Sequence, residues 1–407
     1  MLLLYNIGIY IYYFIAIIAS KLNVKAKAWV NGRREQKVTA SDKSIWFHFA
    51  SLGEFEQGRP VLEAIKLKYP GYPIIVTFFS PSGYEVRKHT PLADAVYYLP
   101  LDTAQNAREF IKNINPVAAI FTKYEYWYHY FNELHRLQVP LYVISAIFRP
   151  GQIFFKWYGG LHREILTKVT RFFVQDEASK QLLFNMGIGN VQVSGDTRFD
   201  RVYANAQQPK SLPPIAAFKN NQPVFIAGST WPADEELIAP LVNLYPNWKF
   251  IIAPHEILEE QITKLLNLLP KEKTVRFSQI SNVTSPLNTY QVLLIDNIGM
   301  LSSLYQYGDT AYIGGGFGAG IHNTLEAAAF GLPVIFGPNY SRFKEANEFI
   351  RLKGGFTVNN DLQLQHVAGK LILDTTYRLK TGKKAVEYVA QNKGATEVIM
   401  KSITIDL

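Results

Sequence analysis

The residues best suited to bind a ligand lie in the stretch AYIGGGFGAGIHNTLEAAAFGLPVIFGP, residues 311–338. A short apolar strand is expected to lead into a glycine-rich turn, then into a helix that carries HNTLE, and then into a second apolar strand. The turn contains Gly314, Gly315, Gly316, Gly318 and Gly320. Glycines between a strand and a helix let the backbone approach a ligand, and the first helical turn offers unpaired N–H groups with a partial positive charge. The stretch therefore predicts a site for an anion, most commonly a phosphate.

Two side chains beside this turn indicate what the anion could belong to. Asn323 and Glu326 are three residues apart, so on a helix they share one face. Asn323 could hold a phosphate or a base, and Glu326 could accept hydrogen bonds from a ribose diol. The simpler alternative is a glycine-rich turn with Glu326 on a solvated helix face. The His-Asn pair, the carboxylate and the closing GLPVIFGP favour a ligand site.

Two further carboxylates follow apolar strands. Glu54 comes after IWFHF, in a loop opened by Gly53 at the start of the next helix. It is either a helix N-terminal carboxylate, worth about 0.3 to 1 kcal/mol, or a general base that removes a proton from an acceptor hydroxyl. Glu56 is expected to be a charge on the helix surface. Glu125, in KYEYWYHYF, either shapes a sugar pocket or neutralises Lys123, and the residues alone leave both open.

The amino-terminal residues 1–20 read MLLLYNIGIYIYYFIAIIAS. About 20 helical residues span roughly 30 Å of hydrocarbon, so this run predicts a membrane anchor. The basic residues follow the run, whereas a secretory signal begins with positive charge, and the positive-inside rule then places the body in the cytoplasm. These basic residues are Lys21, Lys25, Lys27, Arg33 and Arg34. Asn6 and four tyrosines leave open a helix that lies in the membrane surface.

Strands and helix-length segments alternate along the chain, which predicts doubly wound parallel sheets of the α/β class. The expected strands are residues 45–49, 73–79, 117–121, 141–145, 171–174, 224–227, 250–253, 292–295, 311–313 and 334–336. A stretch rich in proline and polar residues, ANAQQPKSLPPIAAFKNNQP, marks the domain boundary. The predicted organisation is a membrane anchor at 1–22, an N-terminal Rossmann-like domain at 23–205, a linker at 206–223 and a C-terminal Rossmann-like domain at 224–407. Ligands of such folds bind beyond the carboxyl ends of strands, where all the candidates above lie.

Composition excludes several classes of function. The net charge of +9 suits anionic partners such as nucleotides, phosphorylated lipids or an anionic membrane. Nucleic acid is not expected, because the chain shows no RNP-type motif, helix-turn-helix pattern or Lys/Arg run. The chain lacks cysteine, D-x-D, H-x-H and H-x-x-x-H, so no tightly held metal is expected. It also lacks the P-loop and G-x-S-x-G motifs, which argues against a P-loop kinase and a serine hydrolase.

Several stretches together resemble one family, the 3-deoxy-D-manno-octulosonic acid (Kdo) transferases of lipopolysaccharide synthesis. They cover nearly the whole chain in order: the apolar amino terminus, WFHFASLGE, TFFSPSG, KYEYW, FFVQDEASKQLLFNMG, VSGDTRFD, AGSTW, APHE, LLIDNIGMLSSLY and GGGFGAGIHNTLEAAAFGLPVIFGP. The resemblance implies a GT-B glycosyltransferase with a cleft between its two domains, tied to inner-membrane lipids on the cytoplasmic face. It implies CMP-Kdo as donor, the lipid A precursor lipid IVA as acceptor, inversion at the anomeric carbon and no metal in the active site. No cofactor is expected, since CMP-Kdo is a co-substrate.

The resemblance also implies roles for single residues. The glutamate of the family's S-[VL]-G-E motif is its general base, and that residue is Glu54 here. The implied CMP contacts are Ser229, Pro254, His255, Ile298, Gly299, Met300, Gly316, Asn323, Thr324, Leu325 and Glu326. The chain departs from the family at three places, all among the nucleotide contacts. It has Pro254-His255-Glu256 for Pro-Arg-His, Gly299-Met300-Leu301 for Gly-Glu-Leu, and Trp231 for the His that follows Gly-Ser-Thr.

Two other interpretations stay open. The first is another GT-B transferase, or a sugar-nucleotide epimerase, that uses a UDP-sugar; thermal protection by CMP but not UDP would decide against it. The second is a membrane-attached nucleotide-binding protein without catalysis, which binding without turnover would support.

Overall fold

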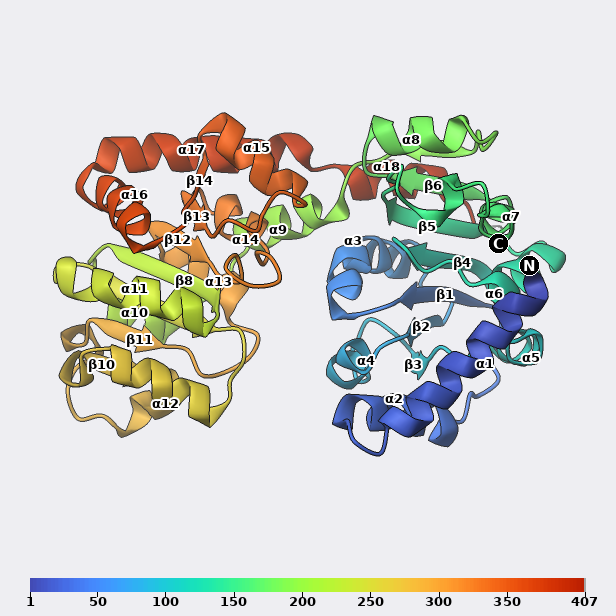
Figure 1. Cartoon of the computed structure of the whole chain (residues 1–407), viewed down its shortest axis with the longest axis horizontal. Coiled ribbons are helices and arrows are strands. Elements are labelled where there is room, and N and C mark those ends of the chain that lie inside the picture. Colours follow the sequence, from blue (N-terminus) through green and yellow to red (C-terminus); the bar gives the residue numbers. More distant parts are fainter. Residues whose placement is uncertain (406–407) are drawn as a thin grey trace. The chain divides into compact units, whose positions relative to one another are not determined.

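The computed structural model describes residues 1–405, which divide into two compact units (Figure 1). Unit 1 consists of Met1–Arg201 together with the chain from Lys393 onward, and unit 2 is Val202–Asn392. Each unit is built on one seven-stranded sheet in which all paired strands are parallel. The predicted α/β class with two doubly wound parallel sheets is confirmed.

The sheet of unit 1 has the strand order β3-β2-β1-β4-β5-β6-β7. Its strands are β1 Ser44–Phe49, β2 Ile74–Phe78, β3 Ala95–Tyr98, β4 Pro116–Thr122, β5 Leu141–Ala146, β6 Arg171–Val174 and β7 Val191–Val193. Its helices are α1 Leu2–Ala19, α2 Val24–Glu35, α3 Leu52–Lys68, α4 Pro81–Arg87, α5 Ala104–Ile114, α6 Tyr128–Arg136, η1 Ile153–Phe155, α7 Gly160–Leu166, α8 Glu177–Phe184 and α18 Ala395–Ser402. All six residues of β1 are buried, as expected for a parallel strand covered on both faces. The strand order reverses between β1 and β4, so the loops that follow these two strands open beside each other.

Unit 2 repeats this plan with the order β10-β11-β9-β8-β12-β13-β14. Its strands are β8 Val224–Thr230, β9 Lys249–Pro254, β10 Thr274–Arg276, β11 Val292–Leu294, β12 Thr310–Ile313, β13 Val334–Phe336 and β14 Gly355–Thr357. Its helices are α10 Pro213–Lys219, α11 Pro232–Leu244, α12 Glu259–Leu268, η2 Lys271–Lys273, η3 Phe277–Asn282, η4 Leu287–Thr289, α13 Leu301–Leu304, η5 Tyr305–Tyr307, α14 Leu325–Ala329, α15 Lys344–Leu352, α16 Asp361–Leu373 and α17 Thr375–Asn392, and α9 Thr197–Gln207 spans the unit boundary. Here the reversal falls between β8 and β12, which places the loop after β8 beside the glycine-rich loop.

The unit boundaries differ from the predicted domains at two places. The segment expected to be a linker contains α10, whose Ile215 and Phe218 are fully buried within unit 2. The carboxyl-terminal segment does not stay with the second domain, because Ile399 and Ile403 join the hydrophobic core of unit 1. Apolar side chains on α18 give the returning chain a place in that core, which an uninterrupted 224–407 domain did not anticipate.

Candidate active site

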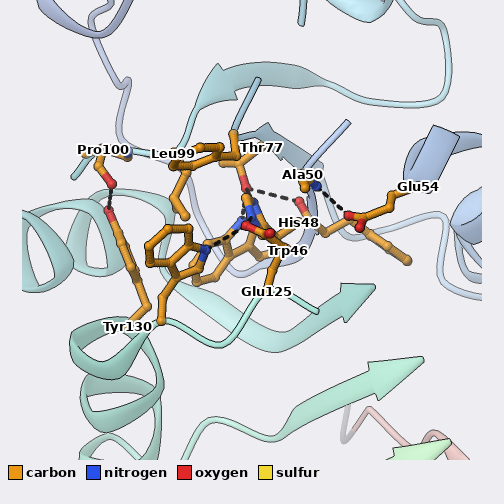
Figure 2. Close-up of polar contacts among 12 residues, drawn as sticks. Trp46, His48, Ala50, Glu54, Thr77, Leu99, Pro100, Glu125 and Tyr130 are labelled. Atoms are coloured by element: carbon orange, nitrogen blue, oxygen red, sulfur yellow. Dashed lines mark hydrogen bonds and ion pairs between the residues drawn. The ribbon is translucent and has the colours of Figure 1, made fainter. Parts of the chain in front are cut away.

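Glu54 lies in the first turn of α3, directly after the central strand β1 (Figure 2). Its Oε2 accepts a hydrogen bond from the Ala50 N–H at 2.7 Å, while the N-cap Ser51 side chain accepts the Glu54 N–H at 3.5 Å. Burial raises the pKa of Glu54 to about 7. The hydrogen bond from the Ala50 N–H acts in the opposite direction and lowers this pKa. The nearby negative charge of Glu125 also raises this pKa, and the charge of Lys123 opposes it. A carboxyl group with a pKa near 7 is suited to accept a proton at neutral pH.

Glu125, which follows β4, ends a chain of buried hydrogen bonds that starts inside the sheet (Figure 2). Its Oε2 lies 2.9 Å from Trp127 Nε1 and 3.4 Å from His48 Nε2, and His48 Nδ1 lies 2.8 Å from Thr77 Oγ1. Burial lowers the pKa of His48, despite the hydrogen bond and charge of Glu125 that raise it, so the ring is neutral. With the proton on Nε2, the ring donates to the carboxylate and accepts from the Thr77 hydroxyl, so both nitrogens are satisfied. The carboxylate of Glu125 is therefore held by Trp127 and His48.

A second buried carboxylate fixes the helix that carries Glu54. Asp196 accepts hydrogen bonds from Gln57 Nε2 of α3 at 2.7 Å and from the Arg198 Nε at 2.8 Å. Burial opposes the charge of Asp196, but the Arg198 guanidinium and its hydrogen bonds hold its pKa below the ordinary value. The start of α3 is thus tied to the segment at the end of unit 1.

Three strand ends at these sites adopt left-handed backbone conformations that are rare outside glycine. The φ angles are +58° at Lys123, +52° at Ser145 and +54° at Ser229. Such strain is retained where surrounding structure enforces it, and it is found often at functional sites. Two of these residues lie at the ends of β4 and β5 in unit 1, and Ser229 lies in β8 of unit 2.

In unit 2, a buried aspartate that the sequence analysis did not single out organises the glycine-rich loop. Asp234 Oδ2 accepts the N–H groups of Trp231 and Gly315, both at 2.9 Å, and Oδ1 accepts the Tyr312 hydroxyl at 2.7 Å. Asp234 is the third residue of α11, after Pro232 at its start. The sequence WPAD could have indicated that Asp234 lies at a helix start, because proline at the first helical position and aspartate at the third are typical of one.

The helix after the glycine-rich loop begins later in the sequence than predicted. α14 has five residues, Leu325–Ala329, so His322 and Asn323 precede it and Thr324 is its N-cap residue. Asn323 Oδ1 accepts the N–H of Leu325 at 3.1 Å, and its Nδ2 donates to Glu326 Oε1 at 3.1 Å. Asn323 and Glu326 do not share a helical face as predicted, because Asn323 precedes the helix, but their side chains are hydrogen-bonded to each other and the N–H of Leu325 is already used. The helix expected to carry His322 and Asn323 therefore begins only at Leu325, and the anion site predicted beside the glycine-rich turn stays a prediction.

Three aromatic rings that follow β8, β9 and the glycine-rich loop stack on one another, and we call Trp231, His255 and His322 the ring stack. The centroids of His255 and His322 are 4.1 Å apart, and those of Trp231 and His255 are 4.9 Å apart. Trp231 Nε1 donates to His322 Nε2 at 3.0 Å. Burial and the nearby His255 lower the pKa of His322 to about 4, so it is neutral at physiological pH. His255, after β9, is the exposed member and presents its ring at the carboxyl end of the sheet.

The glycines of the loop serve the packing of backbone on backbone. A Cβ on Gly314 would lie 2.2 Å from the Ser229 carbonyl oxygen, and a Cβ on Gly316 would lie 2.5 Å from Gly337 Cα. Gly315 has a φ of +90°, and its N–H is bonded to Asp234. The group that approaches Gly314 and Gly316 is backbone of another part of the chain, and the predicted approach to a ligand stays a prediction.

The remaining predicted nucleotide contacts, Pro254 and residues 298–300, lie outside the glycine-rich loop. Pro254 ends β9 next to His255, and the Ile298 side chain is 89% exposed after β11. Gly299 has a φ of +95°, and Met300 is the N-cap residue of α13. Leu301 of α13 and Tyr305 of η5 lie against Gly228 at the end of β8, which is how this segment meets the neighbourhood of the glycine-rich loop.

Residues 1–405 contain no group of three or more His, Asp or Glu side chains placed to hold a metal ion. A reaction without metal stays a prediction, which activity in the presence of a chelator would test.

We expect Asp234→Asn to lower the free energy of unfolding by about 1.5 to 3 kcal/mol, since the amide cannot accept from all three donors that the carboxylate satisfies. The measurement is the Tm by calorimetry, together with CMP binding. The control is Glu236→Gln, the same change on an exposed residue of the same helix. Equal Tm values for the two variants would contradict the organising role of Asp234.

Comparison with known proteins finds one family model and several relatives similar to this chain. Residues 24–201 match the family model described as 3-Deoxy-D-manno-octulosonic-acid transferase (kdotransferase). The chain is 27% identical over 373 residues to a 3-deoxy-D-manno-octulosonic acid transferase of Haemophilus influenzae, covering 88% of this chain and 86% of that one. It is 28% identical over 321 residues to the transferase of the same name from Chlamydophila psittaci, covering 76% and 72% of the two chains.

Solved structures share the fold at low sequence identity. The UDP-GlcNAc 2-epimerase of Neisseria meningitidis, bound to UDP-GlcNAc, matches with a TM-score of 0.62 at 15% identity, over 88% of this chain and 98% of that one. The UDP-GlcNAc 2-epimerase of Methanocaldococcus jannaschii matches with a TM-score of 0.55 at 15% identity, over 86% and 99%. The fold is thus of the GT-B type, with two Rossmann-like units. The family match over residues 24–201 and the relatives agree with the motifs that run through the sequence, and together they support assignment to the 3-deoxy-D-manno-octulosonic acid transferase family of glycosyltransferases.

Proposed function

We propose that this protein transfers Kdo from CMP-Kdo to lipid IVA in lipopolysaccharide synthesis, with inversion at the anomeric carbon and Glu54 as general base. The observation that carries the proposal is the half-buried carboxyl group of Glu54, whose pKa is about 7 and which follows the central strand of a Kdo transferase family member. The two relatives described above carry the name of the same transferase.

In the proposed step, a sugar hydroxyl of lipid IVA attacks the anomeric carbon of Kdo. The hydroxyl proton passes to the Glu54 carboxylate, a new carbon–oxygen bond forms, and the bond from the anomeric carbon to the phosphate oxygen breaks. CMP leaves with the bonding electron pair as a phosphate monoester. Burial, with a smaller contribution from the charge of Glu125, raises the pKa of Glu54 to about 7, which suits it to proton transfer near neutral pH.

We propose unit 2 as the site for CMP. The proposed contacts are the exposed ring of His255, the Asn323–Glu326 pair, Ser229, and the segment Pro254, Ile298, Gly299 and Met300. Gly316, Thr324 and Leu325 support these contacts from the backbone, since the Leu325 side chain is fully buried and Gly316 packs on Gly337. His255 is a ring with two nitrogens that could serve the phosphate, in place of the arginine that the family usually has.

The acceptor and the basic composition support attachment at the membrane. Lipid IVA is a phosphorylated lipid, and the net charge of +9 suits both it and an anionic surface. We place the protein on the cytoplasmic face of the inner membrane, because the anionic headgroups of that leaflet attract the basic residues that follow the apolar helix α1.

The test is transfer from CMP-Kdo, generated in situ, to lipid IVA in detergent, with product mass as the readout. We expect the mass of lipid IVA to increase by one or more Kdo units, and to do so equally with a metal chelator present. Thermal protection by UDP but not CMP would support a UDP-sugar enzyme instead. Binding of CMP without any product would contradict the proposed reaction.

A further inference from the structure

The amino-terminal helix α1 has two faces with different surroundings. It is long and apolar enough to cross a membrane, by length and composition. One face lies against unit 1 and carries residues spaced as one helical stripe: Tyr5, Asn6, Ile9, Tyr13, Ala16 and Ile17. Figure 1 shows α1 running beside unit 1 towards α2.

The inner face of α1 is held by polar contacts with partners in unit 1. The Tyr5 hydroxyl donates to Asp102 Oδ2 at 2.5 Å, and Asn6 Oδ1 lies 2.7 Å from His129 Nε2 on α6. Near its other end, Arg34 Nε of α2 donates to the Tyr13 hydroxyl at 3.0 Å. These contacts occur at both ends of the helix, so α1 is docked along its length.

Asp102 makes this docking specific. The carboxylate is buried and also accepts the N–H groups of His129 and Tyr130, both at 3.1 Å. Burial raises the pKa of Tyr5, which keeps its hydroxyl protonated as a donor to Asp102. Moving α1 away would leave Asp102 without its closest donor, and it would carry the polar groups of Tyr5, Asn6 and Tyr13 into hydrocarbon.

The outer face of α1 is apolar and open. Its large side chains are between 45% and 72% exposed: Leu3, Leu4, Ile7, Tyr10, Ile11, Phe14, Ile15 and Ile18. They form one continuous stripe opposite the docked face, and no residue of α1 carries a charge. The exposed Lys21, Lys25 and Lys27 follow directly, so apolar surface and positive charge adjoin. An apolar face next to lysines is suited to bind the surface of an anionic membrane, where hydrocarbon lies beneath negatively charged headgroups.

We propose that α1 lies in the plane of the membrane, docked on unit 1, and buries its outer face in one leaflet of an anionic bilayer instead of crossing it. The docked face then keeps its hydrogen bonds, and the lysines remain at the level of the headgroups. The protein is in this view attached to one leaflet, with unit 1 held against the surface by α1. The inference concerns attachment and does not depend on the donor, the acceptor or Glu54.

Cysteine cross-linking in membranes tests whether α1 stays docked. The chain has no cysteine, so introduced pairs are unambiguous. We expect Asn6→Cys/His129→Cys in the membrane fraction to be joined within one chain by a short bis-maleimide cross-linker, because the side chains they replace meet through Asn6 Oδ1 and His129 Nε2 at 2.7 Å. The matched control is Ile7→Cys/His129→Cys, because Ile7 points away from unit 1, and it should not cross-link. Failure of the 6–129 pair to cross-link in the membrane fraction would overturn the proposal.

Vesicle flotation tests what covers the outer face. We expect Ile7→Ser/Ile11→Ser/Phe14→Ser to bind vesicles of phosphatidylcholine and phosphatidylglycerol about tenfold or more weakly than the parent chain. Phosphatidylcholine alone should bind the parent chain less well than the anionic mixture. The control is Leu67→Ser/Val86→Ser, which removes exposed apolar side chains elsewhere on unit 1 and should float like the parent. If the triple variant floats unchanged but loses self-association, the outer face instead binds a second copy and the proposal is wrong.

Discussion

Glu54→Gln should abolish most Kdo transfer while leaving the fold and CMP binding intact. A positioned general base contributes about 10² to 10⁴-fold, and glutamine keeps the shape and the acceptor oxygen for the Ala50 N–H but cannot take a proton. The measurement is kcat by product mass, with CMP binding measured in parallel. In the parent chain, kcat/KM should rise about tenfold per pH unit up to about pH 7 and then level off, because the carboxyl must lose its proton first.

The stability of Glu54→Gln distinguishes a general base with a raised pKa from a carboxylate that only stabilises the start of helix α3. The pKa of Glu54 is raised from 4.5 to about 7 on folding, so its ionisation costs stability as pH rises through this interval. Glu54→Gln should therefore have a higher Tm than the parent at pH 8 and a similar Tm at pH 5. A carboxylate that only stabilised the helix N-terminus would give the opposite result at pH 8.

The control for Glu54→Gln is Glu63→Gln on the same helix. Glu63 forms a surface ion pair with Arg59 at 2.7 Å, and such pairs are worth about 0 to 1 kcal/mol. We expect its kcat to equal that of the parent. Comparable turnover by the two variants would contradict the general-base role.

The strands that sequence analysis predicted and the strands that it missed differ in their place in the sheets. All ten predicted strands are present, and most of their observed ends lie within about two residues of the predicted ends. The four that were missed, β3, β7, β10 and β14, are the edge strands of the two sheets. An interior parallel strand is covered on both faces and must be apolar throughout, whereas an edge strand has one neighbour and can be short and partly exposed. β7, for example, has three residues and none is buried.

For the candidate site, the sequence located the strand ends but not the contacts between them. Glu54 and Glu125 were both recognised from their positions after apolar strands, and the strand order brings those loops together. His48 and Asp234 were missed, because their roles depend on partners distant in sequence: His48 reaches Glu125 across 77 residues, and Asp234 reaches Gly315 across 81. The late start of α14 at Leu325 was also missed, since its apolar run LEAAAF gives no signal of where the first turn begins.

Gly314→Ala and Gly316→Ala should both destabilise unit 2 strongly. The added methyl would lie 2.2 Å from the Ser229 carbonyl oxygen in the first variant and 2.5 Å from Gly337 Cα in the second, and real Cβ atoms are not found at such distances. In both cases the obstacle is backbone of a neighbouring segment, so no side chain can rotate away. Overpacking costs about 1 to 3 kcal/mol even where side chains adjust, and we expect at least the upper end of that range here.

Gly318→Ala is the matched control in the same loop. The nearest atom to its added Cβ is the Gly315 carbonyl oxygen at 3.7 Å, an ordinary contact, and its φ is not in the left-handed region. We expect its Tm to lie close to that of the parent, since a surface change of this kind stays within about 0.5 kcal/mol.

The Tm without ligand distinguishes two explanations for the glycines. If they serve to bring backbone against a bound nucleotide, alanine at 314 or 316 should weaken CMP binding and leave the Tm of the free protein unchanged. If they serve to pack the loop on β8 and on the end of β13, the Tm of the free protein should fall before any ligand is added. The contacts with Ser229 and Gly337 predict the second result, with loss of CMP binding as its consequence.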